Sequence, residues 1–258
     1  MPEIDVPLRR LRFGETARRD AWWRPQAVTF TILLGFIVYA TWAAFQGAHY
    51  SYGPYLSPFY SPLLFGGEHA WFGAFPSWVP RFVTPAMVIL WMPGGFRVTC
   101  YYYRGAYYKS FWADPPGCAV GEPREAYLGE RSFPLILQNV HRYFLYLALV
   151  FIVLLALDAW HGLWFDGHFG IAVGSLVLLA NVILLSCYTL GCHSFRHLVG
   201  GGEDIHSDKP LTKACYDCVS GLNRRHMLFA WLSLFGVALT DVYVRLCSMG
   251  IIRDLRIA

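Results

Sequence analysis

Long runs of apolar residues alternate along the chain with shorter segments rich in charge, proline and glycine. A run of about 20 apolar residues is the length that crosses the hydrocarbon core of a bilayer as an α-helix. The pattern predicts five such crossings, at residues 27–46, 81–108, 133–157, 169–197 and 224–247. We therefore expect an all-α polytopic membrane protein, with residues 1–258 forming a single membrane domain built as a five-transmembrane-helix bundle.

The second and the fifth of these runs carry charged residues that need partners. The second contains Pro93-Gly94-Gly95, which should break or kink its helix, and then Arg97. An arginine at this depth needs a partner, such as a carboxylate, a backbone carbonyl or a bound group. Near the far end of the fifth run, Asp241 and Arg245 are spaced as a helical i, i+4 pair.

Composition and charge agree with a membrane protein and suggest its orientation. Only 15% of the 258 residues are charged, 56% are hydrophobic, and the mean hydropathy is +0.38, which excludes an ordinary soluble domain. Lys and Arg concentrate in the N-terminal tail and in residues 109–133 and 198–225, whereas 47–80 and 159–168 contain none. The positive-inside rule then predicts a cytoplasmic N-terminus and an external C-terminus.

This topology assigns a depth to each polar residue, and one layer near the cytoplasmic face collects metal-liganding side chains. Cys100, His141, Cys192 and His193 come from three different spans and fall at similar depth. Ionisable and liganding residues are costly inside a membrane and usually mark function. The layer therefore predicts a metal or redox centre.

Two kinds of centre suit these ligands. Two histidines from different helices could hold a haem iron, whereas two cysteines and two histidines could hold a Rieske-type [2Fe-2S] cluster. The thiols favour the cluster, because a haem would leave them unused. Cys192 and His193 are adjacent and point about 100° apart on a helix, so Cys187 and His197 are substitutes. His193 and His197 share a helical face.

Basic and aromatic residues also gather at the inner interface, just below this layer. A quinone headgroup needs hydrogen-bond donors, and its tail needs an apolar groove. The alternative is an ordinary aromatic belt with snorkelling arginines. The candidate quinone-binding residues are Trp22, Trp23, Arg104, Tyr107, Arg196 and His197.

Two segments resemble a known family: residues 97–108 (RVTCYYYRGAYY) and 192–201 (CHSFRHLVGG), together with the region around His141. They are similar to the membrane anchor of succinate dehydrogenase and fumarate reductase, specifically its actinobacterial type. The resemblance implies a multi-pass protein of the bacterial plasma membrane that docks a flavoprotein subunit and an iron–sulfur subunit on the cytoplasmic side. It also implies electron transfer from succinate to quinone, with the succinate site outside this chain.

The chain departs from the usual five-span anchor of this class, which holds two haems with four histidines. Its first span contains no histidine, and its second carries Cys100 at the corresponding place. The actinobacterial type is understood to hold a Rieske-like cluster, which agrees with the mixed Cys/His layer. We further expect lipid contacts, no nucleic-acid partner and no catalytic residue in this chain; the complex could also form a higher oligomer.

Three alternatives remain open from the sequence. One is a haem b anchor of the same complex, with the iron between His141 and His193. Another is a small-solute transporter in which Arg97 and Asn181 line the path. The pair Cys215 and Cys218 could bind zinc or could be free loop thiols.

Overall fold

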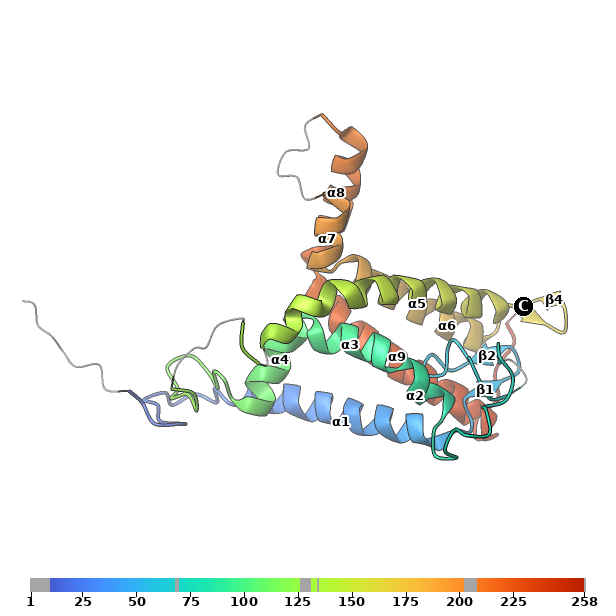
Figure 1. Cartoon of the computed structure of the whole chain (residues 1–258), viewed down its shortest axis with the longest axis horizontal. Helices are drawn as coiled ribbons and strands as arrows, with labels where there is room; N and C mark the ends of the chain where they lie inside the picture. Colours follow the sequence, from blue (N-terminus) through green and yellow to red (C-terminus); the bar gives the residue numbers. More distant parts are fainter. Residues whose placement is uncertain (1–9, 68–69, 126–130, 134, 202–207, 258) are drawn as a thin grey trace, which may run out of the picture. The chain divides into compact units, whose positions relative to one another are not determined.

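The computed structural model describes residues 10–257 except 68–69, 126–130, 134 and 202–207. Helices dominate the described chain (Figure 1). They are α1 (Arg24–Gln46), α2 (Pro85–Ile89), α3 (Trp91–Thr99), α4 (Tyr101–Trp112), the 3-10 helix η1 (Leu135–Val140), α5 (His141–His161), α6 (Val173–Leu190), α7 (His193–Val199), α8 (Pro210–Asn223) and α9 (His226–Ser248). Two antiparallel hairpins join them: β1 (Ser51–Tyr52) with β2 (Tyr55–Leu56), and β3 (Trp164–Phe165) with β4 (His168–Phe169).

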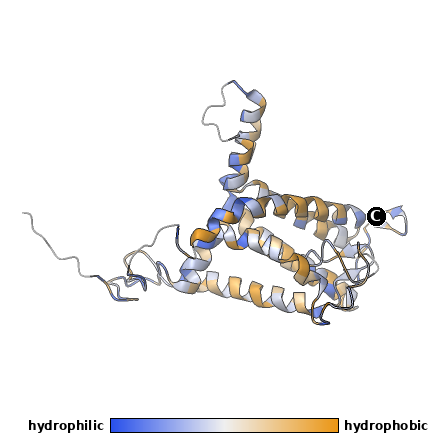
Figure 2. Ribbon diagram, viewed as in Figure 1, coloured by the Kyte–Doolittle hydropathy of each residue, from blue (hydrophilic) through white to orange (hydrophobic). Residues whose placement is uncertain are grey.

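Among the described residues, four helical segments are long and apolar enough to cross a membrane: α1, η1 with α5, α6 and α9. Their outward faces leave large apolar side chains uncovered, with Val38 61%, Ile183 53% and Leu239 63% exposed. Figure 2 shows the same helices coloured as the most hydrophobic parts of the chain. Apolar faces of this extent suit lipid rather than water, so the all-α membrane class predicted from the sequence is confirmed.

The second predicted span is interrupted rather than merely kinked. α2 ends at Ile89, α3 runs from Trp91 to Thr99, and α4 begins at Tyr101. Pro93 therefore lies in the first turn of α3, where a missing N–H costs nothing because those groups have no partner within the helix. The proline and its glycines mark the start of a new helix, and no single long helix covers 81–108.

The fourth predicted span also ends early. α6 stops at Leu190, and Gly191 and Cys192 separate it from α7. The loop expected after it contains α8, which Figure 1 shows beside α7. Arg196 on α7 joins the two helices: its Nε donates to Ser220 Oγ at 3.0 Å, and its guanidinium lies 4.6 Å from the Tyr216 ring centre.

The chain divides into two compact units, residues 1–35 with 100–138 and residues 36–99 with 139–258. In the first unit, the N-terminal segment is tied to the loop that follows α4. Gly14 N donates to Gly121 O and Gly121 N to Glu15 O, both at 2.9 Å, while Thr16 Oγ1 donates to Ala119 O at 2.7 Å. These bonds hold the segment that enters α1.

The second unit is a helical bundle in which α6 packs against α9 and α5, and α3 packs against α5. Gly95 permits the close approach of α3 and α5, because a Cβ at this position would collide with the ring of Phe144. Packing between small and large residues of this kind is what brings membrane helices together without a hydrophobic driving force.

A buried ion pair closes the end of this bundle, and it confirms the predicted Asp241–Arg245 pair. Arg245 Nε donates to Asp241 Oδ2 at 2.7 Å, and both side chains are almost fully buried. Tyr39 and Ser57 also donate to the Asp241 carboxylate. Arg245 in turn donates to the carbonyls of Ala43 and Ala48. The pair thus fastens α1 and the following loop to α9.

Candidate functional site

His141 begins α5 and is held by two residues of α3. Its ring stacks on Phe96 with centroids 4.6 Å apart, and its Nδ1 lies 2.9 Å from Thr99 Oγ1. The side chain is buried, with 7% exposed. Two contacts of this kind fix both the plane and the rotation of the imidazole, and they leave Nε2 as the nitrogen that can bind another group.

His226 begins α9 and lies against α6. Its ring stacks on Tyr188 with centroids 5.0 Å apart, and Tyr188 meets Phe96 edge to face at 5.5 Å. The rings therefore form a continuous row from His141 through Phe96 and Tyr188 to His226. His226 falls at the start of the predicted fifth span, 224–247, but it was not predicted as a ligand.

Arg97 lies beside this aromatic row. Its guanidinium donates to Ser233 Oγ at 3.0 Å and to the carbonyl of Ala230 at 3.4 Å, and it lies 4.8 Å from the Tyr188 ring centre. These contacts confirm the expectation that an arginine within the apolar pattern finds partners, here a hydroxyl, a backbone carbonyl and an aromatic face. A fixed positive charge therefore lies next to Tyr188.

Cys192 and His193 point in different directions, as their adjacency predicts. Cys192 is 1% exposed and caps α7, where its Sγ accepts a hydrogen bond from Phe195 N at 3.3 Å. His193 is exposed, and its Nε2 lies 3.0 Å from His197 Nε2. Partial burial, and then the neighbouring His197 and Arg196, lower the pKa of His193 below 6.5. His193 therefore pairs with His197 rather than facing the buried side.

Cys100 belongs to the first unit, where it precedes α4 as its N-cap residue. It is 2% exposed, and its carbonyl accepts a hydrogen bond from Arg104 N at 2.7 Å. In the chain it directly follows Thr99, the residue that contacts His141. Cys187 is half-buried on α6. Across the described residues, no group of three or more His, Cys, Asp or Glu side chains converges as a metal site would.

Four of the six candidate quinone residues lie in the first unit. Arg104 donates to Gln138 Oε1 at 2.8 Å and lies 4.4 Å from the Tyr101 ring centre. Tyr107 packs against Trp112 with centroids 5.7 Å apart. Trp22 is partly buried and Trp23 is 54% exposed. The other two, Arg196 and His197, lie on α7 in the second unit.

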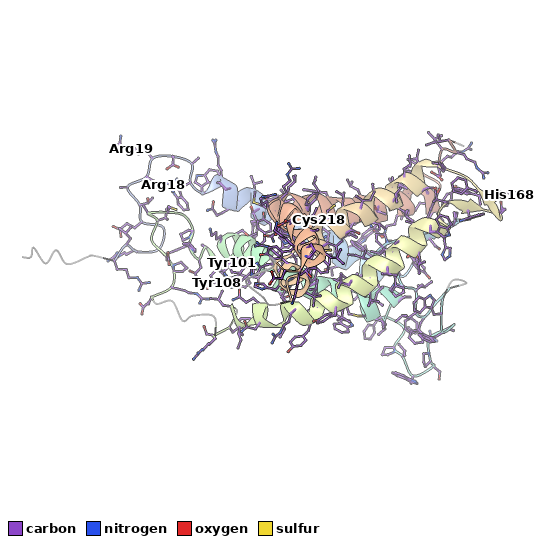
Figure 3. All side chains as sticks on the ribbon, turned by 90° about the horizontal axis from the view of Figure 1, so that it is seen from above. Arg18, Arg19, Tyr101, Tyr108, His168 and Cys218 are labelled. Carbon is purple, nitrogen blue, oxygen red and sulfur yellow. The ribbon has the colours of Figure 1, made fainter. Side chains whose placement is uncertain are left out.

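A polar pocket of about 380 Å³ opens beside Arg104 in the first unit. It is lined by α4 and by the loop that follows, in which Asp114 and Arg124 form an ion pair. Figure 3 shows Tyr101 and Tyr108 on α4, and the Arg124 guanidinium lies 5.0 Å from the Tyr108 ring centre. Donors, aromatic rings and a cavity thus occur together here, which is the combination expected of a small-molecule site.

A second cavity, of about 180 Å³, lies inside the helical bundle of the second unit. Phe96, Arg97 and Tyr188 line one part of it, and the remaining lining is almost entirely apolar. Arg97 is the charged residue in that lining. The structure therefore places one cavity against the aromatic row and another beside Arg104.

The molecule is thus defined as a helical membrane protein with one buried and one partly buried histidine, buried thiols, and pockets that contain arginine and aromatic side chains. A family model described as the actinobacterial succinate dehydrogenase subunit SdhC matches residues 24–250. The chain belongs to this family, and it is therefore a membrane subunit of a bacterial succinate dehydrogenase and a multi-pass protein of the plasma membrane. This membership sets aside the transporter alternative.

A solved structure agrees with the family. One chain of the Mycobacterium smegmatis Sdh1 complex in the apo form is 43% identical, and the match covers 98% of each chain with a TM-score of 0.89. No curated protein matches the chain. The resemblance of residues 97–108 and 192–201 to the actinobacterial anchor is therefore confirmed at the level of the whole chain.

Proposed function

We propose that this subunit anchors the flavoprotein and iron–sulfur subunits of succinate dehydrogenase on the cytoplasmic side and carries their electrons to quinone through a [2Fe-2S] centre. The observation that carries this proposal is the pair of histidines that begin α5 and α9, joined by the rings of Phe96 and Tyr188. The match to a chain of the Sdh1 complex supports the assembly with soluble subunits.

The donor types support an iron–sulfur centre of the Rieske kind. Such a centre takes two thiolates on one iron and two imidazoles on the other. Cys100, Cys192 and His141 are buried donors of these types. We propose His226 as the second imidazole in place of His193, because His193 is exposed and turned toward His197.

When bound, such a centre accepts and releases one electron at a time. The chain's own residues orient and tune the ligands. Thr99 and Phe96 hold the imidazole of His141. Partners of this kind fix the ring orientation of a ligating histidine and raise its basicity. Arg97 supplies a positive charge beside Tyr188, which favours the reduced form of a nearby centre by Coulomb attraction.

For the quinone, we propose a site formed around Arg104 on α4. Its guanidinium can donate to a quinone carbonyl while Gln138 holds it in place. Tyr107 and the two tryptophans Trp22 and Trp23 supply further donors and apolar surface. We separately propose Arg196 and His197 on α7 as residues that donate hydrogen bonds to quinone.

We also propose that the chain crosses the membrane five times, with the interrupted helices α2 to α4 as the second crossing and the N-terminus in the cytoplasm. The basic residues of the N-terminal tail and of the segments after α4 and α7 support this orientation. A phosphatase that is active only outside the cytoplasm, fused after the last residue, tests it. Activity is expected, and an inactive fusion with full membrane insertion would contradict five crossings from a cytoplasmic N-terminus.

The absorption and EPR spectra of the purified complex distinguish the cluster from a haem. A Rieske-like EPR signal with no sharp reduced α band supports the cluster. A sharp α band that depends on His141 would support the haem b alternative instead, with the iron held by His141 and a second histidine. Absence of both signals from a complex with full subunit composition would exclude any resident redox centre in this chain.

A further inference from the structure

His193 and His197 form a two-histidine pair on the surface of α7. Their spacing of four residues puts them on one helical face, and their Nε2 atoms lie 3.0 Å apart with the rings nearly perpendicular, at 87°. Both side chains are exposed. Nothing in the proposed electron path needs the two nitrogens to face each other.

We infer that this pair binds one divalent transition-metal ion of the zinc type through both Nε2 atoms. Zinc binds imidazole nitrogen at about 2.0–2.1 Å in tetrahedral geometry, which sets two ligating nitrogens about 3.3 Å apart. The observed 3.0 Å requires a shift of a few tenths of an ångström. Histidines four residues apart on a helix are also how the H-E-x-x-H motif presents two ligands to zinc.

The neighbouring charged side chains do not occupy the space between His193 and His197 where the metal ion would bind. Arg196 lies between the two histidines in the chain, but its guanidinium is turned to α8, where it contacts Ser220 and Tyr216. Its guanidinium is therefore held by side chains of α8. Lys213 of α8 is paired with Asp217 at 3.4 Å.

The site is an open one. No third His, Cys, Asp or Glu joins the pair within the described part of the chain, so water must complete the coordination. Structural zinc sites are closed by four protein ligands, and a two-ligand site exchanges its ion readily. We therefore expect reversible occupancy that follows the free metal concentration rather than a permanently bound ion.

The ion would also affect quinone reduction, a consequence that rests on the proposed function of His197. A metal on Nε2 removes this nitrogen as a donor to quinone and fixes the end of α7. Bound zinc should therefore slow electron transfer from succinate to quinone. It should leave reduction of a soluble dye by the flavoprotein unaffected, because that step does not use α7.

The test is equilibrium dialysis of the intact, chelator-treated complex against zinc alone, with zinc counted per complex. The variants are His193→Ala and His197→Ala, and His197→Cys keeps a zinc ligand at the same position. His168→Ala is the matched control, since Figure 3 shows His168 far from Cys218 on α8.

We expect one exchangeable zinc in the wild type, in His168→Ala and in His197→Cys. Binding should be at least about tenfold weaker in each alanine variant of the pair, since one of two protein ligands is lost. No exchangeable zinc in the wild type, or wild-type zinc affinity in both His193→Ala and His197→Ala, would overturn the site. Zinc that binds as expected without slowing quinone reduction would refute only the quinone role of His197.

Discussion

Replacing Asp241 by Asn should destabilise the second unit strongly while keeping the shape of the side chain. In the wild type the carboxylate accepts hydrogen bonds from Tyr39, Ser57 and Arg245, and both members of the ion pair are at most 3% exposed. The amide removes the negative charge and leaves the Arg245 guanidinium buried without its counter-charge. Breaking one side of a buried pair typically costs about 3–5 kcal/mol.

The appropriate assay is reversible unfolding of the purified complex in mixed micelles with increasing denaturing detergent. Asp217→Asn is the matched control, because Asp217 and Lys213 form an i, i+4 pair with both side chains more than 60% exposed. Exposed pairs contribute about 0–1 kcal/mol. The free energy of unfolding should fall by about 3–5 kcal/mol in Asp241→Asn and by less than about 1 kcal/mol in the control. Equal losses in the two variants would refute the reasoning.

Two further results are expected. Gly95→Ala should lower the free energy of unfolding by about 1–3 kcal/mol, because its Cβ collides with Phe144. Gly94→Ala is the control, since a Cβ at Gly94 meets nothing within 4 Å. Equal effects of the two substitutions would contradict the close packing of α3 and α5. Arg104→Ala should raise the KM for quinone by about tenfold or more, since a charge-assisted hydrogen bond contributes about 1.5–3 kcal/mol, and should leave dye reduction by the complex unchanged; an unchanged KM would remove Arg104 from the quinone site.

The long apolar runs made the helices predictable, because periodicity and length are strong signals in a membrane. Local packing could not be predicted from the sequence in the same way. Pro93 and its glycines were expected to break or kink a helix; the break lies at Leu90, and Pro93 falls in the first turn of α3. The outcome depends on which turn the proline occupies, and neighbouring helices decide that.

The candidate site was predicted in part. The depth in the membrane that the topology predicts placed His141 and Cys192 near one end of the bundle, and both are buried. Depth cannot tell which way a side chain points, so His193 was grouped with Cys192 although a helix cap turns them apart. His226 was not grouped with them, because its contact with Tyr188 comes from the packing of α9 against α6.

Iron and acid-labile sulfide, counted in the intact complex before and after substitution, test the central claim most directly. The variants are Cys192→Ser and His226→Ala, with His193→Ala as the control on the exposed side of α7. The expected result is the loss of about two irons and two sulfides per complex in the first two variants, as a [2Fe-2S] centre requires, and no loss in the control. Full iron and sulfide in Cys192→Ser and His226→Ala, with the subunits still assembled, would contradict the proposed redox centre.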